Sequence, residues 1–182
     1  MDEAGRGPLA GPVVAAAVIL PQGWEGPPGL DDSKKMTHKG RQAAEQEIKA
    51  RAVAWRVTAA THDVIDRINI LQATLEAMAR AVNALQPGAD YVLVDGNRPP
   101  TVGQPLATVV RGDSRSITIA AASVLAKTAR DKIMAAYAER YPQWGFEIHK
   151  GYPTQAHRQA IRLHGTSPIH RLSFRGTGGD AP

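Results

Sequence analysis

An apolar run from Val13 to Leu20 is the feature that most constrains what this chain can fold into. The run is β-branched at several positions and is bounded by Pro12 and Pro21, which is typical of a buried strand. Further strands are expected over residues 53–59, 91–94 and 106–110. These segments predict a sheet that needs helices to cover its faces.

Helix-forming segments alternate with these strands. Thr37 is a suitable cap for a helix that runs to about Arg51, and Asn69 for a helix with apolar residues at 4-3-4-3 spacing. Two more helices are expected over residues 117–140 and 154–163, with an aromatic loop over 141–153 between them. The mixture predicts a single α/β domain in which a mixed sheet is flanked by helices.

The composition of this 182-residue chain excludes several kinds of protein. With no cysteine, the chain has neither disulfides nor thiol chemistry nor cysteine-bound zinc, which fits a cytoplasmic protein. No apolar run approaches the ~18 residues of a membrane-spanning helix. The opening also lacks the basic and apolar stretches of a signal peptide. We therefore expect a cytoplasmic protein with no membrane partner.

The charge of the chain is modestly basic, with a formal net charge of +5. Its distribution is more informative, because the segment 147–175 holds one acidic residue among several basic ones: Lys150, Arg158, Arg162, Arg171 and Arg175. A basic segment of this kind suits a polyanion. Phosphate contacts are expected in this part of the chain.

Two adjacent carboxylates, Asp2 and Glu3, stand at the head of the sequence and are followed by the turn Gly5-Arg6-Gly7. Neighbouring acids repel each other, and a fold usually separates them unless a cation lies between them. Glycines allow backbone N–H groups to approach an anion closely. Carboxylates for a metal beside amides for a phosphate suggest phosphodiester chemistry.

Two further carboxylates, Asp95 and Asp113, are placed where predicted strands end. In α/β folds this is the usual place for a functional site. Hard divalent cations prefer oxygen ligands, and a two-metal site needs several converging carboxylates. Asp2, Glu3, Asp95 and Asp113 are therefore candidate ligands for Mg²⁺ or Mn²⁺.

Seven collinear segments resemble the ribonuclease HII family, the type 2 ribonucleases H. They are DEAGRGPLAGPVVAAAV (2–18), DDSKK (31–35), VDGN (94–97), GDS (112–114), AASVLAK (121–127), HKGYPT (149–154) and HRLSF (170–174). The resemblance implies a ribonuclease H-like fold over residues 1–175. It also implies an endonuclease that cleaves the RNA strand of RNA–DNA hybrids and nicks duplex DNA 5′ of an embedded ribonucleotide.

The same resemblance assigns roles to particular residues. The four carboxylates match the metal ligands of the family, and Gly5-Arg6-Gly7 matches the turn that contacts the 2′-hydroxyl side of the scissile nucleotide. Tyr152 matches the tyrosine that stacks at the RNA–DNA junction, and Ser33 and Lys34 match a segment that contacts the nucleic-acid backbone. Two ions would activate a water and stabilise the leaving 3′-oxygen, so the products would carry 5′-phosphate and 3′-hydroxyl ends.

The ends of the chain differ from the family pattern. Only Met1 precedes Asp2, so the hydrophobic strand that members carry before the Asp-Glu pair is expected to be truncated. This predicts that Asp2 lacks rigid support and that a central sheet position stands empty. The segment 176–182 is expected to be a disordered tail. The chain is expected to act as a monomer.

Other interpretations of the motifs remain open at this stage. Ser114 in GDS could be a hydrolase nucleophile, although it comes late in the chain and is followed by an arginine. His149, His157, His164 and His170 could bind zinc, but their spacing fits no helix face, and surface or phosphate-proximal positions are favoured. Lys127, Arg130 and Asp131 are expected on an exposed helix face. Asp31 and Asp32 could be extra metal ligands, although a loop cap is favoured.

A nucleic-acid binder without catalysis is the alternative from a different functional class. Such a protein gains nothing from carboxylates that face phosphate groups. The presence of all four acids therefore favours an enzyme.

Overall fold

The computed structural model describes residues 1–31, 33 and 36–177. Along the chain, strands and helices follow one another in a mixed order. They are β1 (Asp2–Ala4), β2 (Val13–Ile19), α1 (His38–Arg51), β3 (Ala54–Ala60), α2 (His62–Asn83), β4 (Val92–Asp95), β5 (Leu106–Val109), α3 (Ile117–Arg140), α4 (Phe146–His149) and α5 (Gln155–His164), with 3-10 turns η1 (Gly112–Ser114) and η2 (Pro142–Trp144).

The strands form two sheets that meet at Met1. In the first sheet β1, β2 and β3 are antiparallel neighbours, and in the second β4 and β5 are parallel. The amino group of Met1 donates a hydrogen bond of 2.7 Å to the carbonyl of Leu93, and the N–H of Asp95 donates one of 3.1 Å to the carbonyl of Met1. These bonds place the start of β1 beside β4.

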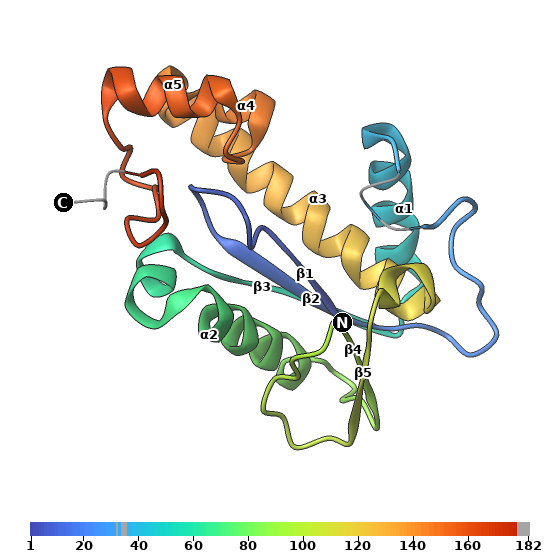
Figure 1. Cartoon of the computed structure of the whole chain (residues 1–182). Coiled ribbons are helices and arrows are strands. Elements are labelled where there is room, and N and C mark those ends of the chain that lie inside the picture. The colour runs from blue at the N-terminus through green and yellow to red at the C-terminus, as the bar shows by residue number, and fades with distance from the viewer. Residues whose placement is uncertain (32, 34–35, 178–182) are drawn as a thin grey trace.

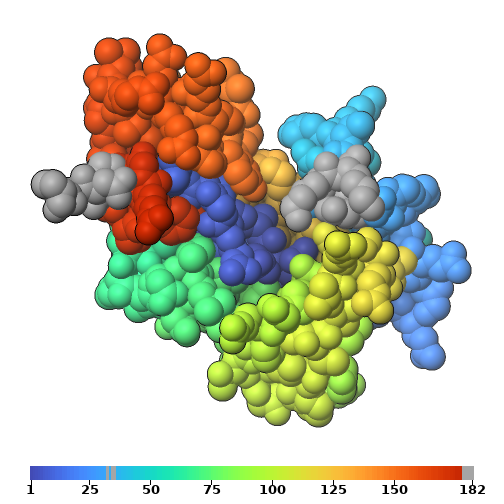
Figure 2. Space-filling view, viewed as in Figure 1, coloured from blue at the N-terminus to red at the C-terminus, as the bar shows by residue number. Residues whose placement is uncertain are grey.

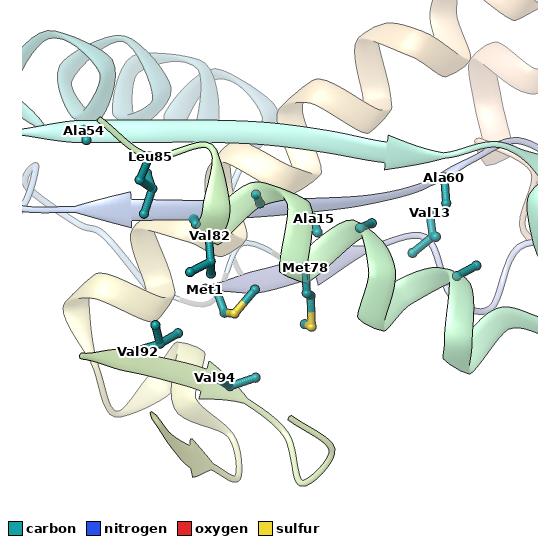
Figure 3. Packing of buried hydrophobic residues seen from close by; sticks show 14 of the residues in the cluster. Met1, Val13, Ala15, Ala54, Ala60, Met78, Val82, Leu85, Val92 and Val94 are labelled. Atoms are coloured by element: carbon teal, nitrogen blue, oxygen red, sulfur yellow. The ribbon is translucent and has the colours of Figure 1, made fainter. Parts of the chain in front are cut away.

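Helices cover both faces of the antiparallel sheet, with α2 on one side and α1 and α3 on the other (Figure 1). The side chains of β2 alternate between the two layers, as the two-residue period of a strand requires. Val13 and Ala15 face α2, whereas Ala16 and Val18 face α1 and α3. Figure 3 shows Met1 packed among the residues of the α2 layer. The expected α/β domain is therefore confirmed, with its strands divided between two sheets.

The predicted elements agree closely with the structure except around two segments. Helix α2 begins at His62, and Asn69 lies inside it with a φ of 67°. Because the side chain of Asn69 accepts a hydrogen bond from the N–H of Gln72 at 3.1 Å, it caps the second part of α2, as expected. The aromatic loop contains the short helix α4 and the turn η2.

A cavity of about 720 Å³ lies between the end of β2 and β4, and Met1, Leu20 and Tyr91 are among the residues that line it. None of the four candidate metal ligands lines it.

The expected truncation of a strand before Asp2 stays a prediction. The expected lack of rigid support for Asp2 is not found, because Asp2 pairs with Ala16 of β2.

Residues 178–182, which make up most of the expected disordered tail, lie outside the described residues. Thr177 is described and is buried, and its hydroxyl donates to the carbonyl of Arg171 at 2.9 Å. Among the described residues, none of the helices combines the length and the apolar character needed to traverse a lipid bilayer.

Candidate active site

Strand β1 presents the two adjacent carboxylates on a rigid support. Asp2 lies opposite Ala16 in the antiparallel pair, and its side chain is almost fully buried. The N–H of Glu3 donates a hydrogen bond of 2.7 Å to Oδ1 of Asp2. Glu3 is partly exposed and forms an ion pair of 3.5 Å with Arg6. Neighbouring positions of one strand thus hold one buried and one accessible carboxylate.

The third and fourth carboxylates come from the parallel sheet and the turn that follows it. Asp95 ends β4, beside Met1. Its Oδ1 accepts a hydrogen bond of 2.6 Å from the N–H of Gly112, the first residue of η1. Asp113 is the next residue of that turn and is partly exposed. The fold therefore brings the segments of all four predicted ligands to one end of the sheets.

Mutual repulsion and burial act on these carboxylates. Burial, together with the negative charges of Glu3 and Asp95, raises the pKa of Asp2 to about 8. Burial also lowers the pKa of the Met1 amino group to about 6. A divalent cation would offset this concentration of negative charge, so the donor set fits such an ion.

The described side chains do not form a preassembled coordination shell. Over residues 1–31, 33 and 36–177, no group of three or more acidic or histidine side chains converges closely enough to hold a metal ion. The assignment of Asp2, Glu3, Asp95 and Asp113 as metal ligands therefore stays a prediction. What the structure adds is the electrostatic proximity of Asp2, Glu3 and Asp95 and the location of Asp113 in the turn that is bonded to Asp95.

A groove runs past the carboxylates. One part, of about 210 Å³, is lined by Glu3, the Gly5-Arg6-Gly7 turn, Ser123, Lys127 and Tyr152. An adjoining part, of about 80 Å³, shares Glu3 and Arg6 and reaches Asp95 and Arg98. In Figure 2 the N-terminal segment (blue) lies at the centre of the face, between the C-terminal helices (orange) and the segment around residue 100 (yellow-green).

The Gly5-Arg6-Gly7 turn and Tyr152 both line this groove, and their contacts with a substrate stay a prediction. Gly5 has a φ of +96°, and a Cβ at this position would lie 2.0 Å from Nε of Arg130, so the turn requires glycine there. Tyr152 is 39% exposed, and its ring edge lies 4.0 Å from where a Cβ of Gly7 would stand. The aromatic ring is therefore available to a ligand that lies on the turn.

Ser33 also lines the groove, but its side chain is buried and its hydroxyl lies 2.8 Å from that of Ser123. Lys34 and Asp32 lie outside the described residues. Asp31 is exposed. The predicted contact of Ser33 and Lys34 with a nucleic-acid backbone stays a prediction.

The prediction that Lys127, Arg130 and Asp131 form an exposed face of α3 is wrong. Arg130 and Asp131 are 1% and 9% exposed, and Arg130 donates hydrogen bonds to three backbone carbonyls, two in the N-terminal loop and one at Lys150. Lys127 does form the expected ion pair with Asp131, at 2.7 Å. The alanine-rich helix is buried on more than one side, because both the sheet and the C-terminal segment pack against it.

Three of the four histidines are buried, which corrects the expectation that they lie on the surface. Nε2 of His157 and Nε2 of His170 are 3.0 Å apart, and Nδ1 of His157 lies 2.9 Å from the carbonyl of Tyr152. Nδ1 of His170 accepts from the N–H of Ser167 at 2.7 Å. Since a ring nitrogen facing a carbonyl must donate, His157 carries its proton on Nδ1 and accepts at Nε2 from His170.

Buried in this way, the histidines serve the fold. Burial lowers the pKa of His157 and of His170 to about 4, so both rings are neutral at physiological pH. His149 is buried as well, and His164 is exposed. The ring nitrogens of the three buried histidines bond to one another and to backbone groups, which gives the zinc alternative no support.

The serine-hydrolase alternative has no support either, because Ser114 is exposed and its hydroxyl donates to the carbonyl of Arg111 at 3.0 Å. The groove also contains residues that were not assigned a role from the sequence, namely Arg98, Ser123 and Lys127. The segment AASVLAK, which contributed to the resemblance, holds the last two and was the available signal.

Comparisons with known proteins agree with the geometry. The sequence model of the family described as Ribonuclease HII matches residues 1–177. A ribonuclease HII from Dechloromonas aromatica is 57% identical over 175 residues, which span 96% of this chain and 88% of the relative.

Two solved structures share the fold. The ribonuclease H2 from Pyrococcus horikoshii OT3 has a TM-score of 0.79 at 22% identity and covers 97% of this chain and 92% of its own. Bst-RNase HIII in complex with Mn²⁺ has a TM-score of 0.69 at 17% identity, covering 97% of this chain and 66% of its own. The chain thus belongs to the ribonuclease HII family of ribonuclease H hydrolases, which cleave the RNA strand of RNA–DNA hybrids.

Proposed function

We propose that this chain also nicks duplex DNA on the 5′ side of a single embedded ribonucleotide, and that it uses two divalent cations, Mg²⁺ or Mn²⁺. One observation carries the proposal: Glu3 of β1 and Asp95 of β4 line the same groove as the Gly5-Arg6-Gly7 turn and Tyr152. Carboxylates that would hold metal ions are thus neighbours of groups that would distinguish the sugars.

The carboxylates would hold the cations. Asp2, Glu3, Asp95 and Asp113 offer oxygen donors from three segments, and a family neighbour was solved in complex with Mn²⁺. Two such ions supply an activated water for in-line attack and stabilise the leaving 3′-oxygen. Products with 5′-phosphate and 3′-hydroxyl ends follow from that chemistry.

The turn and the tyrosine would read the sugar. The 2′-hydroxyl is the group that separates ribose from deoxyribose, and it both donates and accepts hydrogen bonds. Gly5, Arg6 and Gly7 line the groove, and their backbone groups would contact this hydroxyl. The half-exposed ring of Tyr152 can stack under the neighbouring sugar that lacks this hydroxyl. Ser33 and Lys34 would contact the backbone of the nucleic acid.

A nicking assay tests the proposal. The substrate is a DNA duplex with one ribonucleotide, incubated with Mg²⁺ or Mn²⁺ and the chain as written. A cut on the 5′ side of the ribonucleotide, with a 5′-phosphate end that ligates and with no cut by Asp95→Asn, is the expected result. Binding without any cut on this duplex or on an RNA–DNA hybrid would favour the non-catalytic alternative.

We also infer that the protein acts as a monomer in the cytoplasm. The site proposed above calls on no residue of a second copy, and a sequence without cysteine fits a reducing compartment. Light scattering of the active protein measures the oligomeric state directly, and a mass twice 19.4 kDa would contradict the monomer.

A further inference from the structure

Two arginine side chains are buried beneath the N-terminal loop. Arg130 of α3 is 1% exposed, and Arg171, near the C-terminus, is 0% exposed. In the described part of the chain, their guanidinium hydrogen bonds go to backbone carbonyl oxygens. This is unusual, because buried arginines are generally paired with carboxylates.

Arg171 holds the first half of the loop. Its Nη2 donates to the carbonyl of Gly5 at 2.6 Å, and its Nη1 donates to those of Arg6 at 2.9 Å and Pro8 at 2.7 Å. Its Nε donates to the carbonyl of Gly11 at 2.9 Å. One planar guanidinium group therefore holds four carbonyls of the loop, all on the inner side of the loop.

Arg130 holds the second half of the loop and connects it to the tyrosine segment. Its Nε and Nη2 donate to the carbonyls of Pro12 and Ala10 at 3.0 and 3.1 Å. Its Nη1 donates to the carbonyl of Lys150 at 3.0 Å, and the guanidinium lies 5.8 Å from the ring centre of Tyr152. The two substrate-facing segments thus share one anchor.

The orientation of these carbonyls determines where the N–H groups point. In a trans peptide, the C=O and the following N–H point to opposite sides. When Arg171 takes the carbonyls of Gly5 and Arg6 inward, the N–H groups of Arg6 and Gly7 are directed away from it. Since Arg6 and Gly7 line the groove, those N–H groups face the groove.

The two guanidinium groups also contribute charge. Burial, with a smaller contribution from the nearby charge of Arg130, lowers the pKa of Arg171 to about 9, so the group remains a cation at neutral pH. Among the described residues no carboxylate is hydrogen-bonded to either guanidinium, although Asp131 lies near Arg130 and Asp66 near Arg171. The charge strengthens the hydrogen bonds that both groups donate to the loop carbonyls.

We propose that Arg171 and Arg130 are positioning residues for the substrate: by holding the loop carbonyls on the inner side, they present the N–H groups of Arg6 and Gly7 to a phosphodiester and 2′-hydroxyl. The proposal rests on the function proposed above. It assigns the two arginines no contact with the substrate, so their effect should appear in binding rather than in the chemical step.

The test compares Arg171→Lys and Arg130→Lys with the matched control Arg80→Lys. Arg80 also donates to a backbone carbonyl, that of Ala59 at 2.7 Å, but it lies on α2 and does not line the groove. A lysine keeps the positive charge but lacks the planar guanidinium group that donates to several carbonyls at once. With the single-ribonucleotide duplex we expect KM to rise about 10-fold or more in the two variants, with kcat within about 3-fold of the parent, since a loop that is no longer held presents its N–H groups less well to the bound substrate.

Several outcomes would overturn the proposal. If Arg171→Lys and Arg130→Lys are folded and have the same KM as Arg80→Lys, the proposal is overturned. A fall in kcat with unchanged KM would instead point to the catalytic step, and it would overturn the proposal equally. Thermal melting establishes that each variant is folded at the assay temperature.

A measurement on the parent protein covers the case in which neither variant folds. Hydrogen exchange of the Arg6 and Gly7 amides is followed with and without a metal-free RNA–DNA hybrid. We expect exchange to slow about 10-fold when the duplex binds, because the two N–H groups become donors to it. Unchanged exchange in the bound state would overturn the proposal. If instead the amides are protected but no substrate is cleaved, the nicking function fails and the positioning role stands.

Discussion

The backbone N–H of Gly112 donates a hydrogen bond of 2.6 Å to Oδ1 of Asp95, which joins the turn that carries Asp113 to the end of β4. A carboxylate oxygen that accepts a backbone bond is held in one orientation. The other oxygen of Asp95 then remains available for a different partner. This bond therefore orients one candidate ligand and places the segment of another.

Asp95→Asn should reduce turnover of a single-ribonucleotide duplex by roughly 100-fold or more, since the loss of one metal-bound charge removes several kcal/mol of transition-state stabilisation. The amide keeps an oxygen for the N–H of Gly112, so the fold should survive. Asp90→Asn is the matched control, because Asp90 is exposed and precedes β4. Circular dichroism and steady-state kinetics measure both effects. Turnover equal to that of Asp90→Asn would contradict the metal-ligand assignment.

Removal of divalent metal should abolish cleavage and lower the melting temperature. A cation between Asp2, Glu3 and Asp95 offsets the repulsion that raises the pKa of Asp2. At a metal concentration of about 100 times Kd, binding adds about 2.7 kcal/mol of stability. For a chain of this length that corresponds to roughly 5–10 °C in Tm. Calorimetry with EDTA, Mg²⁺ and Mn²⁺ provides the measurement, and an equal gain in Asp95→Asn would count against the site.

Tyr152→Ala should reduce the preference for a single ribonucleotide over a continuous RNA–DNA hybrid by about 10-fold, since stacking on an aromatic ring is worth about 1–3 kcal/mol. Tyr152→Phe keeps the ring and should retain the preference. Tyr91→Ala is the control, because Tyr91 is similarly exposed but lines the separate cavity. The ratio of kcat/KM for the two substrates is the quantity to measure. An equal loss on both substrates would exclude a role in sensing the junction.

Stability should fall as the pH is lowered from about 6.5 towards 4, because His157 and His170 bind protons more readily in the unfolded chain than in the fold. Above that window their contribution is fully present. Between pH 7.5 and 5, one such group accounts for about 2 kcal/mol. Urea unfolding of His157→Gln should therefore show a flatter pH dependence than the parent. His164→Gln, at an exposed position, should not change the slope, and identical slopes for all three proteins would refute the assignment.

Gly151→Ala should destabilise the fold more than Gly165→Ala. Both glycines have positive φ values, +83° and +73°, so both variants carry a backbone cost. A Cβ at Gly151 would also lie 2.7 Å from the carbonyl oxygen of Ala10, whereas nothing lies within 4 Å at Gly165. We expect a difference of about 1–3 kcal/mol in the free energy of unfolding. Equal values would show that the loop at Ala10 yields easily.

The sequence was sufficient to predict most elements, because their signals are local. The Thr37 cap accepts the expected hydrogen bond from the N–H of Gly40, and α3 has the predicted bounds. The location of Asp95 at a strand end followed from the same kind of signal. The first part of α2 was not predicted, because Asn69 has a positive φ and interrupts the helix, so its sequence signal is that of a helix start.

Burial of polar residues was not predictable in this way. Lys127 and Asp131 have the spacing of a surface ion pair, and nothing local indicates that Arg130 faces the loop at Ala10. The buried pair of His157 and His170 joins residues of two segments and satisfies its ring nitrogens with backbone groups. Such partners are set by tertiary packing rather than by pattern.

The bonds of Arg171 to Gly5 and Gly11 connect positions that are 166 and 160 residues apart in the chain. A nascent chain on the ribosome therefore carries all four candidate carboxylates well before Arg171, the side chain that holds the adjacent loop, has been synthesised. Contacts of such long range form late in folding. The groove is thus completed only once Arg171 has been added, so that a product terminated before it would have the acidic residues and no ordered surface on which to seat a nucleic acid.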